Sequence, residues 1–78
     1  MATLRLFASV REAAGERSVT IDGASVGDVI TAATEKFGEH FEALIPTCKI
    51  WVNGEPAEYD TTIEPTDEVA ILPPVSGG

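Results

Sequence analysis

The stretch Ser25-Val26-Gly27-Asp28-Val29-Ile30-Thr31-Ala32-Ala33-Thr34-Glu35-Lys36-Phe37-Gly38 decides which architecture we expect for this chain. Its apolar residues recur at the spacing of a single helix face, and they are Val26, Val29, Ile30, Ala33 and Phe37. Ser25 is suited to cap the helix N-terminus, with Asp28 in the first turn, and Gly38 stands where a C-terminal cap belongs. Because only one face is apolar, we expect this helix to cover one face of a sheet.

Alternating apolar residues on the N-terminal side of the helix predict two strands. Residues 3–8 place Leu4, Leu6 and Ala8 on one face, and residues 18–21 alternate again. Residues 10–16 contain Gly15 and several charges, which favours a loop. These segments together predict an opening β-hairpin.

The C-terminal side of the helix predicts the rest of the sheet. Residues 39–44 favour a short helical turn, and residues 47–52 a strand with Cys48, Ile50 and Val52 facing inward. Asn53-Gly54 is a strong hairpin signal, which predicts a short return strand over 57–59. After a loop over 60–67, residues 69–72 form a last strand. We therefore expect an α+β fold, a mixed sheet of four to five strands with one main helix packed across one face.

The sheet face away from this helix is predicted to be an exposed patch. Period-two alternation turns six side chains to that face: Arg5, Phe7, Lys49, Trp51, Ala70 and Leu72. A register slip of one residue would reverse this assignment. Aromatic and apolar anchors beside basic residues are typical of a protein-binding surface.

Length and composition limit the classes of function. A chain of 78 residues forms one small domain, too small to enclose a deep enzyme pocket. A net charge of −8 argues against nucleic acid and anionic membranes as partners, and favours basic or apolar protein surfaces. One cysteine provides neither a disulfide framework nor a multi-thiolate metal site. No apolar run near the N-terminus resembles a signal peptide, so we expect a cytoplasmic protein.

Familiar catalytic arrangements are absent from the sequence. It has no phosphate-binding glycine loop, no HExxH, no CxxC and no GxSxG motif. His40 has no predicted partner, Cys48 is expected in the core, and the acidic residues lack the spacing of a calcium loop. We expect no metal, no bound cofactor and no catalysis by the chain alone.

The last six residues, 73–78, do not suit a packed core. Pro73 and Pro74 favour an extended course, while Gly77 and Gly78 lack side chains. Such a segment can reach roughly 20 Å and suits a narrow channel in another protein. We therefore divide the chain into a domain over 1–72 and an extended tail over 73–78. The ionised Gly78 carboxylate is a poor electrophile until a partner adenylates it.

Three segments resemble the ubiquitin-like β-grasp sulfur carriers of the MoaD/ThiS family. They are residues 6–12, residues 52–54 and, most specifically, residues 67–78. The proline pair before Val75-Ser76-Gly77-Gly78 is closer to the small subunit of molybdopterin synthase than to the thiazole-synthesis carrier.

This resemblance implies a mechanism and a set of site residues. An ATP-dependent activating enzyme of the ubiquitin-activating type would adenylate Gly78, and a sulfur donor protein would convert the acyl-adenylate to a thiocarboxylate. The tail, with Gly77, Ser76, Val75, Pro74 and Pro73, would enter the large synthase subunit and give sulfur to cyclic pyranopterin monophosphate. Phe7, Arg11 and Leu72 would contact partners. Trp51 departs from the family pattern, and its role as an anchor is predicted from the strand alone.

Three alternatives remain open from the sequence. A carrier for thiazole synthesis or another pathway would use the same thiocarboxylate. A ubiquitin-like modifier would use the same adenylate but join Gly78 to lysines of other proteins. A plain interaction domain would bind through Phe7, Trp51 and Leu72 without any activation of the C-terminus.

Overall fold

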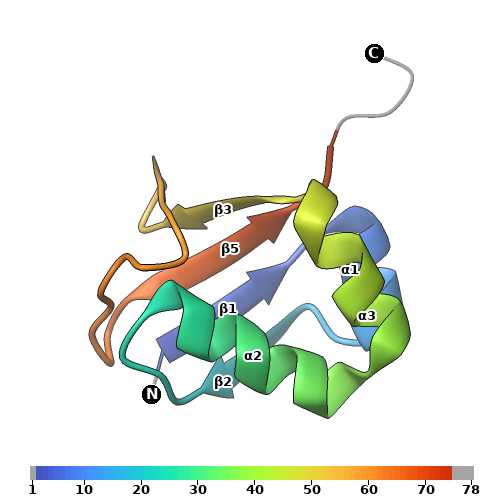
Figure 1. Cartoon of the computed structure of the whole chain (residues 1–78), viewed down its shortest axis with the longest axis horizontal. Coiled ribbons are helices and arrows are strands. Elements are labelled where there is room, and N and C mark those ends of the chain that lie inside the picture. Colours follow the sequence, from blue (N-terminus) through green and yellow to red (C-terminus); the bar gives the residue numbers. More distant parts are fainter. Residues whose placement is uncertain (1, 75–78) are drawn as a thin grey trace.

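The computed structural model describes residues 2–74, which form a five-stranded sheet with helices on one side (Figure 1). The elements in chain order are β1 (Ala2–Leu6), α1 (Ala8–Ala14), β2 (Ser18–Ile21), α2 (Val26–Phe37), α3 (Glu39–Leu44), a 3₁₀ turn (Ile45–Thr47), β3 (Lys49–Val52), β4 (Glu55–Pro56) and β5 (Glu68–Leu72). The strand order is β2-β1-β5-β3-β4.

The sheet is mixed, as the sequence predicts. β1 and β5 pair in parallel at its centre, with Leu4 beside Val69 and Leu6 beside Ile71. All other pairs, β1 with β2, β3 with β5 and β3 with β4, are antiparallel. This arrangement around one main helix is the β-grasp architecture that the resemblance implies.

Helix α2 begins and ends where its caps predict. The Ser25 Oγ accepts a hydrogen bond from the Asp28 N–H at 3.2 Å, and an Asp28 carboxylate oxygen accepts one from the Ala24 N–H at 3.2 Å. The first bond satisfies an amide group that the first helical turn leaves free, and the second ties the residue before the cap to that turn. At the other end Gly38 has φ of 95°, a conformation that glycine adopts without strain.

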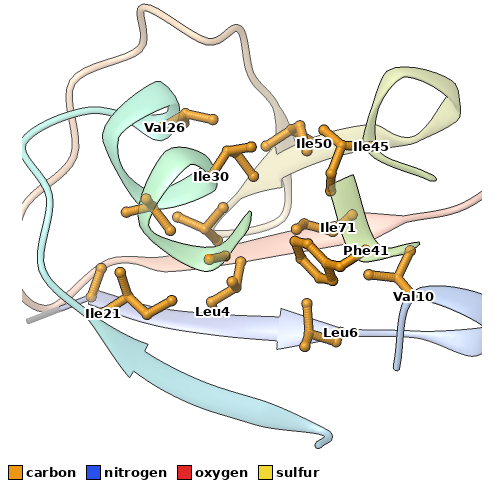
Figure 2. Close-up of a cluster of buried hydrophobic side chains, with 14 of the residues drawn as sticks. Leu4, Leu6, Val10, Ile21, Val26, Ile30, Phe41, Ile45, Ile50 and Ile71 are labelled. Atoms are coloured by element: carbon orange, nitrogen blue, oxygen red, sulfur yellow. The ribbon is translucent and has the colours of Figure 1, made fainter. Parts of the chain in front are cut away.

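The core lies between the sheet and the helices (Figure 2). Leu4, Leu6 and Ile71 project from the central strands toward Ile30 of α2 and Phe41 of α3. Phe41 is fully buried, and its ring centroid lies 5.1 Å from that of Phe37. Helix α3 confirms the helical turn predicted over 39–44. None of the helices within residues 2–74 is long and apolar enough to cross a membrane.

The structure corrects the segment between the first two strands. Residues 10–16 were expected to form a loop, but α1 occupies Ala8–Ala14 and ends at Gly15 with φ of 80°. β1 therefore stops at Leu6, and Ala8 is exposed rather than inward-facing. A seven-residue helix with one buried side chain, Val10, shows too little periodicity to be recognised by pattern.

The return strand after the Asn53-Gly54 turn was also placed wrongly. β4 comprises Glu55–Pro56 rather than residues 57–59, because a two-residue turn brings the next residues directly into pairing. Asn53 and Gly54 have φ of 51° and 83°, as that turn requires. At the other end of the hairpin, β3 begins at Lys49, since Thr47 belongs to the 3₁₀ turn.

Asn53 also ties this turn to the start of β5. Its side chain donates to Asp67 Oδ1 at 2.9 Å and accepts from the Glu68 N–H at 2.9 Å. Asp67 Oδ2 accepts from the Glu64 N–H at 2.8 Å. The hydrogen bonds from the Glu64 amide and from Asn53 hold the pKa of the Asp67 carboxyl below its usual value. The entry of the chain into its central β5 strand is thus fixed by side-chain hydrogen bonds.

Candidate protein-docking site

The face of the sheet opposite the helices carries the predicted patch. Strand register places Arg5 beside Ala70, Ala70 beside Trp51, and Leu72 beside Lys49. Their sequence neighbours Leu6, Ile50 and Ile71 are buried, whereas Trp51, Ala70 and Leu72 are half-buried and the two basic residues are exposed. This alternation confirms the predicted register. That a partner binds this face remains a prediction.

Phe7 lies at the edge of this face rather than within a strand. It precedes α1, with extended backbone angles of −132° and 149°, and its side chain is 36% exposed. Leu6 pairs with Ile71 in a parallel ladder, so Phe7 and Leu72 follow at the same end of β1 and β5. The two predicted docking residues therefore share the end of the sheet from which the tail departs.

Arg11 and Phe7 line one hollow of about 290 Å³ at this end. The other residues around it are Arg5, Leu6 and Arg17. The sequence predicted Arg5 on the open face but gave no role to Arg17. The Arg17 carbonyl oxygen accepts a hydrogen bond from the Leu6 N–H at 2.8 Å, which keeps Arg17 beside β1. A signal was available in the sequence, because the arginines recur every six residues in a strongly acidic chain.

Trp51 borders a second hollow, of about 330 Å³, between β3 and residues 56–59. Cys48 and Tyr59 also line it. The Cys48 thiol donates a hydrogen bond to the Leu44 carbonyl oxygen at 3.2 Å, and burial raises its pKa. A half-buried thiol that stays protonated is a poor nucleophile, which agrees with the expectation that Cys48 is a packing residue.

The tail leaves directly from the central strand β5 (Figure 1). β5 ends at Leu72, after which Pro73 is half-buried and Pro74 is exposed. The remaining predicted tail residues, Val75, Ser76, Gly77 and Gly78, lie outside the described residues. Because β5 pairs with β1 on one side and β3 on the other, the first residue of the tail has a fixed starting point.

Comparisons with known proteins agree with this architecture. The ThiS family matches residues 4–78. Small archaeal modifier protein 1 of Haloferax volcanii is 36% identical over 85 aligned positions, covering 95% of this chain and 97% of the relative. A molybdopterin synthase sulfur carrier subunit of Mycosarcoma maydis is 37% identical over 81 positions, covering 92% and 87%. The solution structure of small archaeal modifier protein 1 from Methanosarcina acetivorans superposes with a TM-score of 0.90 at 30% identity, covering 99% of this chain and 95% of that one.

Proposed function

The chain belongs to the ThiS family of ubiquitin-like sulfur carriers, and we propose that it is the sulfur carrier subunit of a molybdopterin synthase. The observation that carries this proposal is the family match, which runs through the Pro73–Gly78 segment that continues from β5. A similar curated protein is named as such a subunit. The exposed Arg5–Lys49 face and the hollow beside Phe7 provide a surface for docking at the base of the tail.

In the proposed reaction the carboxylate of Gly78 is the working group. Its oxygen attacks the α-phosphate of ATP on an adenylating enzyme, pyrophosphate leaves, and an acyl-adenylate forms. Sulfide released by the donor protein then attacks the Gly78 carbonyl carbon and displaces AMP, and loss of the remaining sulfur-bound proton leaves a thiocarboxylate. The absence of side chains at Gly77 and Gly78 keeps this carbonyl open to attack.

The partners supply everything else in this scheme. The large synthase subunit receives the tail and binds cyclic pyranopterin monophosphate, to which the thiocarboxylate sulfur is transferred. The folded domain contributes docking through Phe7, Arg11, Trp51 and Leu72. This division agrees with the small size of the chain, whose hollows are open surface features lined by few residues.

Intact mass spectrometry tests the proposal. The full chain is incubated with the adenylating enzyme, ATP and the sulfur donor of its own organism, and we expect the mass gain of one oxygen replaced by sulfur. The loaded chain, mixed with the large subunit and cyclic pyranopterin monophosphate, should return to its original mass as molybdopterin forms. A chain that gains sulfur but never transfers it to the pterin would point to a carrier for another pathway.

Two controls locate the sulfur. Oxidation of Met1 or Cys48 adds nearly the same mass as the expected exchange, so the shift must be found on the C-terminal peptide. Cys48→Ala should keep the shift, and deletion of Gly78 should abolish it. A shift that follows Cys48 instead of Gly78 would refute the proposal.

A protein modifier is the second candidate, because several of the similar proteins are named small archaeal modifier proteins. In this reading a lysine amine of another protein attacks the carbonyl carbon of the Gly78 adenylate, AMP leaves, the nitrogen loses a proton, and an isopeptide bond forms. The same incubation, with a cell extract added and analysed by mass spectrometry, distinguishes the modifier from the sulfur carrier. Adducts joined to lysines through Gly78, without a thiocarboxylate that reaches the pterin, would favour the modifier.

A further inference from the structure

The arginines of this chain are concentrated at one corner of the fold. The sequence contains 13 acidic residues and five basic ones, of which Arg5, Arg11 and Arg17 are the arginines. All three line the hollow of about 290 Å³ beside Phe7. A protein with a net charge of −8 therefore presents a compact cationic site next to the departure point of its tail.

Backbone structure from three different elements holds these arginines together. Arg5 belongs to β1, Arg11 to α1, and Arg17 immediately precedes β2. The Leu6 N–H bonds to the Arg17 carbonyl oxygen at 2.8 Å, and the Gly15 N–H bonds to the Arg11 carbonyl oxygen at 2.8 Å. The site is thus built on fixed main chain, with exposed guanidinium groups that remain free to adjust.

Acidic side chains flank the arginines, but none lines the hollow beside Phe7. Glu12 and Glu16 share a neighbouring hollow with Arg11 and Arg17. Arg5 pairs with Glu68 at 3.4 Å, and both side chains are about half exposed, at 51% and 48%. Such an exposed and long ion pair stabilises the fold very little and is readily exchanged for another carboxylate. Arg11 and Arg17 form no ion pair with any residue in the range 2–74.

We propose that Arg5, Arg11 and Arg17 form a docking site for acidic side chains of the protein that receives the tail. This inference rests on the proposed function and adds the chemistry of the partner, an Asp- or Glu-rich segment that lies against Phe7. Arginine suits this role because its planar group binds a carboxylate through two parallel hydrogen bonds. Phe7 provides apolar contact at the edge of the same hollow.

The charge distribution favours a protein segment over a polyanion. A nucleic acid approaching this corner would meet the field of a molecule with a net charge of −8. A partner that places a few acidic side chains at the hollow avoids most of this repulsion. The charged residues outside this hollow are mostly acidic, which helps to orient the encounter toward the arginines.

Binding kinetics at several salt concentrations test the proposal. The full chain and its Arg5→Glu, Arg11→Glu and Arg17→Glu variants are measured against the large synthase subunit of the same organism. We expect each reversal to lower the association rate by about tenfold or more at low salt, and the difference to shrink at high salt. Lys36→Glu is the matched control, because it makes the same change of charge on α2, outside this hollow. It should change the rate by less than about twofold.

The outcomes separate this inference from the proposed function. If the wild type binds and the arginine variants behave like Lys36→Glu, the docking site is refuted while the sulfur carrier proposal stands. If inorganic phosphate at constant ionic strength binds the hollow but does not displace the partner from the wild type, the hollow is an anion site of another kind and the proposal fails. Absence of wild-type binding would overturn both. Arg17→Lys should retain much of the rate that Arg17→Glu loses, and unchanged thermal unfolding shows that the variants fold.

Discussion

Replacement of Val10 by Ala should destabilise the protein by weakening the packing of helix α1, the helix that contains Arg11. Val10 is fully buried and is the one buried residue of this helix. A helix of seven residues is unstable by itself in water, and Phe7 provides no side-chain cap. Val10 is therefore the largest contact of α1 with the core, beside the small and partly buried Ala13 and Ala14.

The expected cost follows from the two carbon groups that the substitution removes. At about 0.8 kcal/mol for each buried group, transfer to water accounts for about 1.6 kcal/mol. The cavity left at a fully buried site brings the loss to about 2 to 3 kcal/mol. With a denaturant dependence on the order of 1 kcal/mol per molar urea for so small a domain, the unfolding midpoint should fall by about 2 M.

Equilibrium urea unfolding measures this effect, and Val19→Ala is the matched control. Val19 lies in β2 and is partly exposed, so its truncation should cost less than about 1 kcal/mol. A loss below about 0.5 kcal/mol for Val10→Ala would contradict the reasoning, because α1 would then be held by contacts other than its one fully buried side chain. A similar loss of unfolding free energy for Val10→Ala and Val19→Ala would show that the full burial of Val10 adds nothing to its contribution.

Three further predictions concern docking and the turn beside β5. Leu72→Ala or Phe7→Ala should weaken binding of the large synthase subunit by about 1 to 3 kcal/mol in calorimetry, while urea unfolding shows that the domain stays folded; unchanged affinity would show that the open face is not the docking surface. Asn53→Ala should lower the free energy of unfolding by about 1 to 2 kcal/mol, because it removes two side-chain hydrogen bonds and strains a position with positive φ. Asn53→Gly tolerates that positive φ and should lower the free energy of unfolding by less than Asn53→Ala. Equal losses for the two variants would show that backbone strain does not contribute. Hydrogen bonding lowers the pKa of folded Asp67, so its contribution to stability is present above the unfolded value near ~4 and is lost as the pH falls through the folded value. Asp67→Asn should flatten the pH dependence of urea midpoints in that acidic range, and an unaltered slope would contradict the assignment.

Long periodic segments of the sequence predict their structure well, because their side chains alternate between core and solvent over several turns or residues. The α2 stripe from Val26 to Ala33 is buried, and the caps at Ser25 and Gly38 are in place. The alternation of Val69 and Ile71 also appears as predicted in β5. In these elements local pattern and tertiary packing favour the same conformation.

The errors occur where one long-range contact decides a short segment. Helix α1 depends on Val10 reaching a core formed by elements distant in sequence, so no local period reveals it. Helix α3 was predicted, but the burial of Phe41 was not, because it too depends on packing against distant elements. Arg17 joins the hollow because antiparallel pairing of β1 and β2 returns the chain beside Leu6. The proximity of Arg17 to Leu6 depends on the register of strand pairing, so no short stretch of sequence can predict it.

The central position of β5 has a mechanical consequence for a chain handled by its C-terminus. A pull applied beyond Pro74 along the strand acts across the hydrogen bonds to β1 and β3, which are slanted in the parallel β1 ladder and perpendicular to the strand in the antiparallel β3 ladder. The hydrogen bonds of both the β1–β5 and the β3–β5 ladders then resist the force together. Because β5 is not an edge strand, these bonds cannot break one after another from a free edge. A partner could therefore draw the end of the chain deep into a channel, and withdraw from it, while the domain stays folded.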